Sequence, residues 1–193
     1  MGKPKRKSKL FQDELLDGEE LLWLGQPDPR ALFTRYDLFL IPFSLFWCGF
    51  VTFWLAGASR GGVFALFGVP HALVGIYLLI GRFVYKYWKK RNTYYGVTNQ
   101  RILIQSGLVG TKLDTLAIAN LPSVNKSYGL TGSGSVTFGL TPRTSWWSRG
   151  QMNYANTGLE IFGGDVPGFY DIRETDEVYR LISQLQHEHF QYR

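Results

Sequence analysis

Charge is nearly absent from a long stretch in the first half of this chain, and cysteine is nearly absent throughout. Arg60 is the only charged residue between Asp37 and Arg82. Cys48 is the single cysteine, and none of the three histidines lies near it in sequence. One cysteine excludes a disulfide framework and a paired-cysteine metal site. We therefore expect no metal site and no cofactor.

Two apolar segments, Leu38–Gly57 and Gly61–Gly81, lie on either side of Arg60. Each has about 20 residues, which at roughly 1.5 Å per residue spans a hydrocarbon core of about 30 Å. Neither segment has the polar face that a helix in a soluble core would show. The sequence therefore predicts a transmembrane helical hairpin over residues 38–81. A basic tail and juxtamembrane segment over residues 1–37 would precede this hairpin.

The distribution of basic residues gives the hairpin an orientation. Residues 1–91 hold 13 Lys and Arg against 7 Asp and Glu, whereas residues 92–193 hold 8 of each. A basic excess that flanks apolar segments indicates a membrane and argues against nucleic acid. The positive-inside rule places both termini in the cytoplasm. It also explains the membrane-proximal basic cluster after the second span, which consists of Lys86, Lys89, Lys90 and Arg91.

The pattern changes to short β-like runs after residue 92, so residues 92–193 read as a separate cytoplasmic domain. Before the hairpin, Glu20–Leu24 is one further candidate strand. The chain ends in a predicted amphipathic helix with an apolar stripe at Val178, Leu181, Ile182 and Leu185. Asp171 and Glu174 can form a capping pair at its start. The seven runs after residue 92 are Thr93–Val97, Arg101–Gln105, Lys112–Ile118, Val124–Tyr128, Ser135–Leu140, Gly158–Phe162 and Pro167–Tyr170.

Several of these segments resemble the bacterial pleckstrin-homology-like (PH-like) family. The resemblance extends over residues 18–186 and implies a bacterial inner-membrane protein of the membrane-anchored α+β class. It also implies a strongly bent seven-strand sheet, or partly open barrel, capped by the C-terminal helix. Fold does not imply an activity. The residues that carry the resemblance are Tyr95–Ile104 (YGVTNQRILI), Gly107, Gly18-Glu19, Trp23, Gly25, Pro27, Val178 and Ile182.

A PH fold suggests a phosphoinositide site, but we do not expect one at the first predicted β-hairpin. Such a site needs several Lys and Arg side chains to hold phosphates. The turn Thr98-Asn99-Gln100 is followed by Arg101 alone. We therefore expect no specific headgroup recognition there.

His71 is an ionisable residue inside the second apolar segment, which by default suggests a function. We expect it to face the first helix as an interhelical polar contact near Ser44, Cys48 or Thr52. A proton path through an oligomer is the alternative. A stripe of small residues on the first helix, with Gly68 and Ala72 on the second, could hold the hairpin together or join two copies.

The segment Thr141–Asn156 is the second candidate site. Adjacent tryptophans in a polar stretch need cover, because exposed apolar patches mark contacts. The segment could fold back over the sheet, enter the headgroup layer or bind a protein. Its candidate contact residues are Arg143, Trp146, Trp147, Arg149 and Tyr154.

These features predict a non-catalytic binding or scaffold module on the cytoplasmic face of a membrane. Its expected partners are the lipid bilayer and unidentified membrane or cytoplasmic proteins, and not nucleic acid. The alternative is a small homo-oligomeric assembly in which the helices carry the function. A membrane-bound enzyme subunit is a third interpretation, but no nucleophile with a base, paired carboxylates or metal ligands support it.

Overall fold

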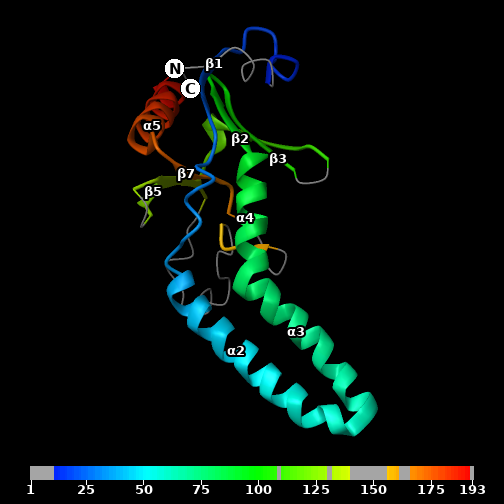
Figure 1. The fold of residues 1–193 in the computed structure, drawn as a ribbon. Helices are drawn as coiled ribbons and strands as arrows, with labels where there is room; N and C mark the ends of the chain where they lie inside the picture. The colour runs from blue at the N-terminus through cyan, green and yellow to red at the C-terminus, as the bar shows by residue number, and fades with distance from the viewer. Residues whose placement is uncertain (1–10, 108–109, 130–131, 140–155, 161–165, 192–193) are drawn as a thin grey trace.

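The computed structural model describes residues 11–107, 110–129, 132–139, 156–160 and 166–191. Two long helical arms extend from a pair of antiparallel sheets, and a C-terminal helix lies beside the sheets (Figure 1). The α+β class is therefore as predicted. In chain order the elements are β1 (Leu21–Gly25), α2 (Asp37–Ala58), a 3-10 helix (Ser59–Phe67), α3 (Gly68–Ile76), a π-helical turn (Tyr77–Gly81), α4 (Arg82–Arg91), β2 (Tyr94–Thr98), β3 (Arg101–Ser106), β4 (Lys112–Ala117), a short 3-10 turn (Ile118–Asn120), β5 (Val124–Tyr128), β6 (Gly134–Phe138), β7 (Gly168–Ile172) and α5 (Thr175–Gln191).

The two arms have the length and composition of membrane-crossing helices. One is Asp37–Ala58, with 22 residues, and the other is Ala65–Arg91, with 27 residues. Their apolar side chains face outward: Leu38 is 85% exposed and Phe53 is 80% exposed. A helical hairpin in a soluble core would bury such side chains.

Close contact between the two arms depends on glycine. A Cβ atom on Gly75 of α3 would lie 2.8 Å from Sγ of Cys48 on α2. A Cβ on Gly68 would collide with the side chain of Leu55. Small residues let helix backbones approach closely where lipid gives no hydrophobic drive for association. In this structure Gly68 and Gly75 therefore allow the two arms of one hairpin to pack closely against each other.

The strands form a four-stranded sheet of order β1-β2-β3-β4 and a three-stranded sheet of order β5-β6-β7, both antiparallel. Their inner faces share one apolar core, and α5 contributes Val178, Ile182 and Leu185 of the predicted stripe to it. Helix α5 contacts β5, β6 and the turn Ile118–Asn120. Within the described residues the two sheets do not close into a barrel.

Among the strands of the described residues, one comes from before the hairpin and six follow it. Strand β1 pairs with β2, with Leu24 opposite Gly96, so the candidate strand at Glu20–Leu24 belongs to the sheet. The run expected at Gly158–Phe162 begins in a turn, and its described residues form no strand. The sheet domain is therefore discontinuous in sequence, and the whole helical hairpin is the connection between β1 and β2.

Candidate binding site

Helix α4 carries three buried basic side chains on one face. Arg82, Lys86 and Lys90 follow one another at intervals of four residues, which aligns them along the helix. Their exposed fractions are 0%, 1% and 4%. Basic side chains are almost never this buried unless they are paired, so their partners determine what this face does.

The carboxylates that pair with this face come from two distant elements. Asp37, at the first residue of α2, forms ion pairs with Arg82 and, at 3.4 Å, with Lys86. Asp171 of β7 accepts a hydrogen bond from Lys90 Nζ at 2.5 Å. Lys86 and Lys90 also donate to the backbone carbonyls of Leu32 and Ala31, respectively.

We call these five side chains, Arg82, Lys86, Lys90, Asp37 and Asp171, the junction network. It joins the start of α2, the end of the second arm and the three-stranded sheet. Removing one partner of a buried pair leaves an uncompensated charge at a cost of about 3–5 kcal/mol. The network therefore fixes the sheets against the helical hairpin.

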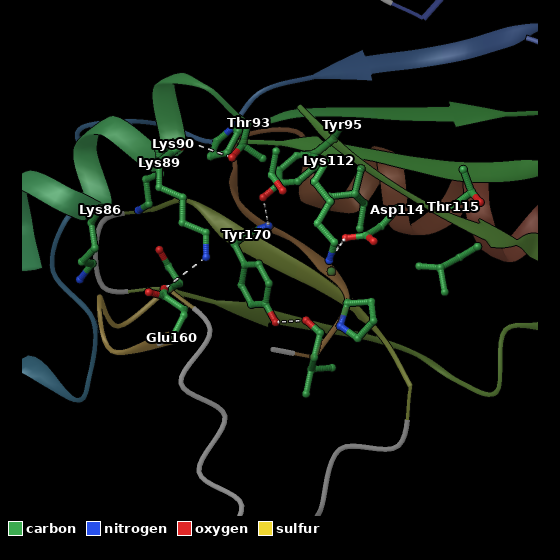
Figure 2. Close-up of a pocket in the computed structure, with 18 residues that line it drawn as sticks. Lys86, Lys89, Lys90, Thr93, Tyr95, Lys112, Asp114, Thr115, Glu160 and Tyr170 are labelled. Carbon is green, nitrogen blue, oxygen red and sulfur yellow. Dashed lines mark hydrogen bonds and ion pairs between the residues drawn. The ribbon is translucent and has the colours of Figure 1, made fainter. Parts of the chain in front are cut away.

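Next to the junction network lies a cavity of about 600 Å³ (Figure 2). It sits at the end of the sheets where α4 meets β2, and it extends between β4 and β7. Figure 2 shows Lys86, Lys89 and Lys90 on one side, Lys112, Asp114 and Thr115 on the other, and Tyr170 between them. The lining residues are Pro27, Lys86, Lys89, Lys90, Thr93, Tyr95, Ile104, Ser106, Lys112, Asp114, Thr115, Leu116, Asn156, Glu160, Val166, Pro167, Gly168 and Tyr170.

Charges of both signs face this cavity. Lys89 Nζ lies 3.6 Å from Oε1 of Glu160, and Lys112 Nζ lies 2.9 Å from Oδ2 of Asp114. Two tyrosines form part of the apolar wall, and the backbone N–H of Tyr170 donates to the Tyr95 hydroxyl at 3.2 Å. A lining with mixed charge and apolar surface suits a ligand that has both polar and apolar groups. It does not favour a purely anionic one.

Residues of the motif Tyr95–Ile104, which carries the family resemblance, bind the segment before β1 at the far end of the four-stranded sheet. We call the contacts of Glu19 with Thr98 and Arg101 the clasp. The carboxylate of Glu19 is fully buried and accepts hydrogen bonds from Thr98 Oγ1 at 2.7 Å and Arg101 Nε at 2.9 Å. Burial raises the pKa of Glu19, but hydrogen bonds from Arg101, the Leu16 backbone and Thr98 outweigh it and hold the pKa below its usual value. Asn99 binds the same segment by accepting from the Glu20 N–H at 3.1 Å.

His71 makes contacts in its own arm and across the hairpin. His71 Nδ1 lies 2.9 Å from the carbonyl oxygen of Phe67 in its own arm. Across the hairpin, the His71 ring stacks on Trp47 with 6.0 Å between centroids. The residues proposed as partners make other contacts: Ser44 and Thr52 donate to carbonyls of α2, and Cys48 lies against Gly75.

The remaining predicted site residues fall into two groups. Arg143, Trp146, Trp147, Arg149 and Tyr154 lie outside the described residues. Of the membrane-proximal basic cluster, Lys86 and Lys90 belong to the junction network, Lys89 lines the cavity, and Arg91 is exposed beside the Tyr87 hydroxyl at 3.2 Å.

Sequence reasoning missed the acidic half of the junction network. Asp171 was expected to cap α5, yet it lies in β7 and binds Lys90. The spacing of Arg82, Lys86 and Lys90 was a usable signal, because one helix face with three cations requires acidic or aqueous surroundings. No local pattern identified Asp37 as the partner.

A family model described as a bacterial PH domain matches residues 50–186, which is more than half of the chain. The matched range begins within α2 and ends within α5, so it contains β2 to β7 and excludes β1. Searches of curated proteins and of solved structures found no match.

Proposed function

The chain belongs to the bacterial PH domain family, and from that premise we propose that it is a non-catalytic binding module anchored in the bacterial cytoplasmic membrane. In this proposal the helical hairpin spans the bilayer and both termini are cytoplasmic. The cavity beside α4 takes a segment of a partner protein at the membrane surface.

The anchoring part of this proposal is supported by the dimensions of the arms. At about 1.5 Å per residue, the 22 residues of Asp37–Ala58 extend about 33 Å, which suffices for a hydrocarbon core of about 30 Å. Exposed aromatic side chains lie near the sheet end of both arms, at Tyr36, Tyr87 and Trp88. Such residues favour the interface between lipid and water.

The position of the cavity is the single observation that carries the binding part. Both chain crossings between the sheets and the hairpin, after β1 and before β2, occur at the end of the sheets that holds the cavity. The junction network fixes this end relative to the arms. If the arms span the bilayer, the cavity is held beside the membrane surface, where a membrane-bound partner can reach it.

The chemistry of the cavity supports a peptide segment as the occupant. Its volume falls in the range of about 300–1,000 Å³ that is usual for ligand pockets. Apolar groups from Ile104, Leu116 and the tyrosines can bury a side chain. The charged pairs on both sides can bind backbone or side-chain polar groups of either sign.

Site-specific photocrosslinking in native membranes tests this proposal. Thr115 is exposed and lines the cavity, so p-benzoylphenylalanine at position 115 should crosslink to a distinct protein. The matched control is the same group at Asn120, which is also exposed but lies outside the cavity. Equal adducts from both positions, or none from position 115, would contradict a binding role for the cavity.

A further inference from the structure

A second, smaller cavity lies between the two arms, well away from the sheets. It has a volume of about 220 Å³ and is lined by Phe50, Val51 and Trp54 of α2 and by Phe67 and His71 of the other arm. Val51 is buried at its base, whereas the other four residues are exposed. The cavity therefore opens sideways from the hairpin, toward the lipid if the arms span a bilayer.

The hydrogen bond of His71 determines which of its ring nitrogens carries the proton. Nδ1 lies 2.9 Å from the carbonyl oxygen of Phe67, and a carbonyl can only accept. In the neutral imidazole Nδ1 is therefore the donor, which leaves Nε2 as an acceptor. Within the described part of the chain, the hydrogen bond of the His71 ring is the one at Nδ1, and none is made at Nε2.

An acceptor without a partner is unfavourable in hydrocarbon, where water cannot satisfy it. The ring cannot easily turn away, because it is held by the Phe67 carbonyl and by stacking on Trp47. A ligand that donates a hydrogen bond to Nε2 would remove the penalty.

From this geometry we propose that the cavity is a lateral binding site for a lipid-soluble ring compound that bears a hydroxyl group, such as a phenol or hydroquinone. The hydroxyl donates to His71 Nε2. The flat ring packs among Phe50, Trp54 and Phe67, because aromatic rings favour stacked and edge-to-face contacts with one another. This inference rests on the proposed membrane insertion of the hairpin.

The experiment is an NMR titration of the full chain, labelled with ¹⁵N-histidine and reconstituted in lipid nanodiscs. Resistance of the same sample to alkaline extraction first establishes insertion, so that a failure of anchoring is seen separately. The probes are 4-hexylphenol and 4-hexylanisole, which differ in whether they can donate a hydrogen bond. The His71 signal is assigned by its loss in His71→Phe.

We expect 4-hexylphenol to shift the His71 Nε2 resonance and to bind about fivefold more tightly than 4-hexylanisole, the factor that one net hydrogen bond contributes. His71→Phe keeps a ring against Trp47 but should abolish the difference between the probes. Thr52→Val, on an exposed face of α2, should leave the difference unchanged. Equal binding of both probes would show that the cavity binds apolar molecules without regard to the hydroxyl group. Binding of neither probe would show that the cavity is not a site for such compounds. Either result in an inserted protein overturns the proposal.

Discussion

Replacing Arg101 by Leu tests whether the family motif is a structural clasp. Arg101 donates to both oxygens of the Glu19 carboxylate, at 2.9 Å and 3.2 Å from Nε and 3.0 Å from Nη2. The Arg101→Leu change removes all three hydrogen bonds. The Glu19 side chain, which is 0% exposed, then keeps only its bonds from Thr98 and the Leu16 N–H.

Breaking a buried ion pair from one side costs about 3–5 kcal/mol. Because the Arg101 side chain is itself 22% exposed, part of the interaction is screened, and we expect about 3 kcal/mol. The assay is denaturant unfolding of the full chain in mild detergent at pH 7, followed by near-ultraviolet circular dichroism. The matched control is Arg173→Leu, since Arg173 pairs with Asp28 while 76% exposed, so solvent screens the pair and its loss should cost much less stability.

The effect should also depend on pH in a defined direction. In the native chain the pKa of Glu19 is held below its usual value of 4.5, so its stabilisation is present above that pH and is lost as pH falls through the folded-state pKa. Without Arg101, burial raises the pKa of Glu19, and protonation then relieves the penalty. The stability difference between native chain and variant should therefore narrow as pH falls through 4.5, from the raised pKa of Glu19 in the variant toward its lowered pKa in the native chain. A loss equal to that of the control, or a difference independent of pH, would refute the clasp.

Two further predictions use pairs of glycines. Gly75→Ala should weaken the contact between the arms and lower the melting temperature in detergent, because its Cβ would lie 2.8 Å from a sulfur of the facing helix. The control Gly57→Ala, whose Cβ would have nothing within 4 Å, should leave the melting temperature unchanged. Equal melting temperatures of the two variants would show that the arms do not pack at Gly75. Gly158→Ala should cost more stability than Gly18→Ala in denaturant unfolding. Both glycines have positive φ, near +83° and +77°, but only a Cβ on Gly158 would also meet the backbone of α4. Equal losses would mean that Gly158 does not pack on this helix.

The hairpin was predictable from sequence because its signal is local. Charge-free segments of about 20 residues and flanking basic residues are each visible within a short window. The apolar stripe of α5 was predictable for the same reason, since Val178, Ile182 and Leu185 recur at helical spacing and are buried as expected.

The junction network and the cavity were not predictable in this way, because they depend on contacts between residues far apart in sequence. Strand β1 and strand β2 are separated by the whole hairpin, so no short pattern indicates that they pair. Lys90 and Asp171 are likewise brought together only by the sheet topology. A basic residue near a membrane segment also has a simpler explanation in the positive-inside rule, which conceals a structural role for Lys86 and Lys90.

Cysteine accessibility in intact cells tests the central proposal, membrane anchoring with a cytoplasmic sheet domain, most directly. In a Cys48→Ser background, Ser59→Cys places a thiol in the connection between the arms and Asn120→Cys places one in the sheet domain. A membrane-impermeant maleimide should label position 59 in intact cells, after permeabilisation of the outer membrane where there is one. It should label position 120 only after the cytoplasmic membrane is disrupted. Labelling of position 120 in intact cells, or protection of position 59, would contradict the account.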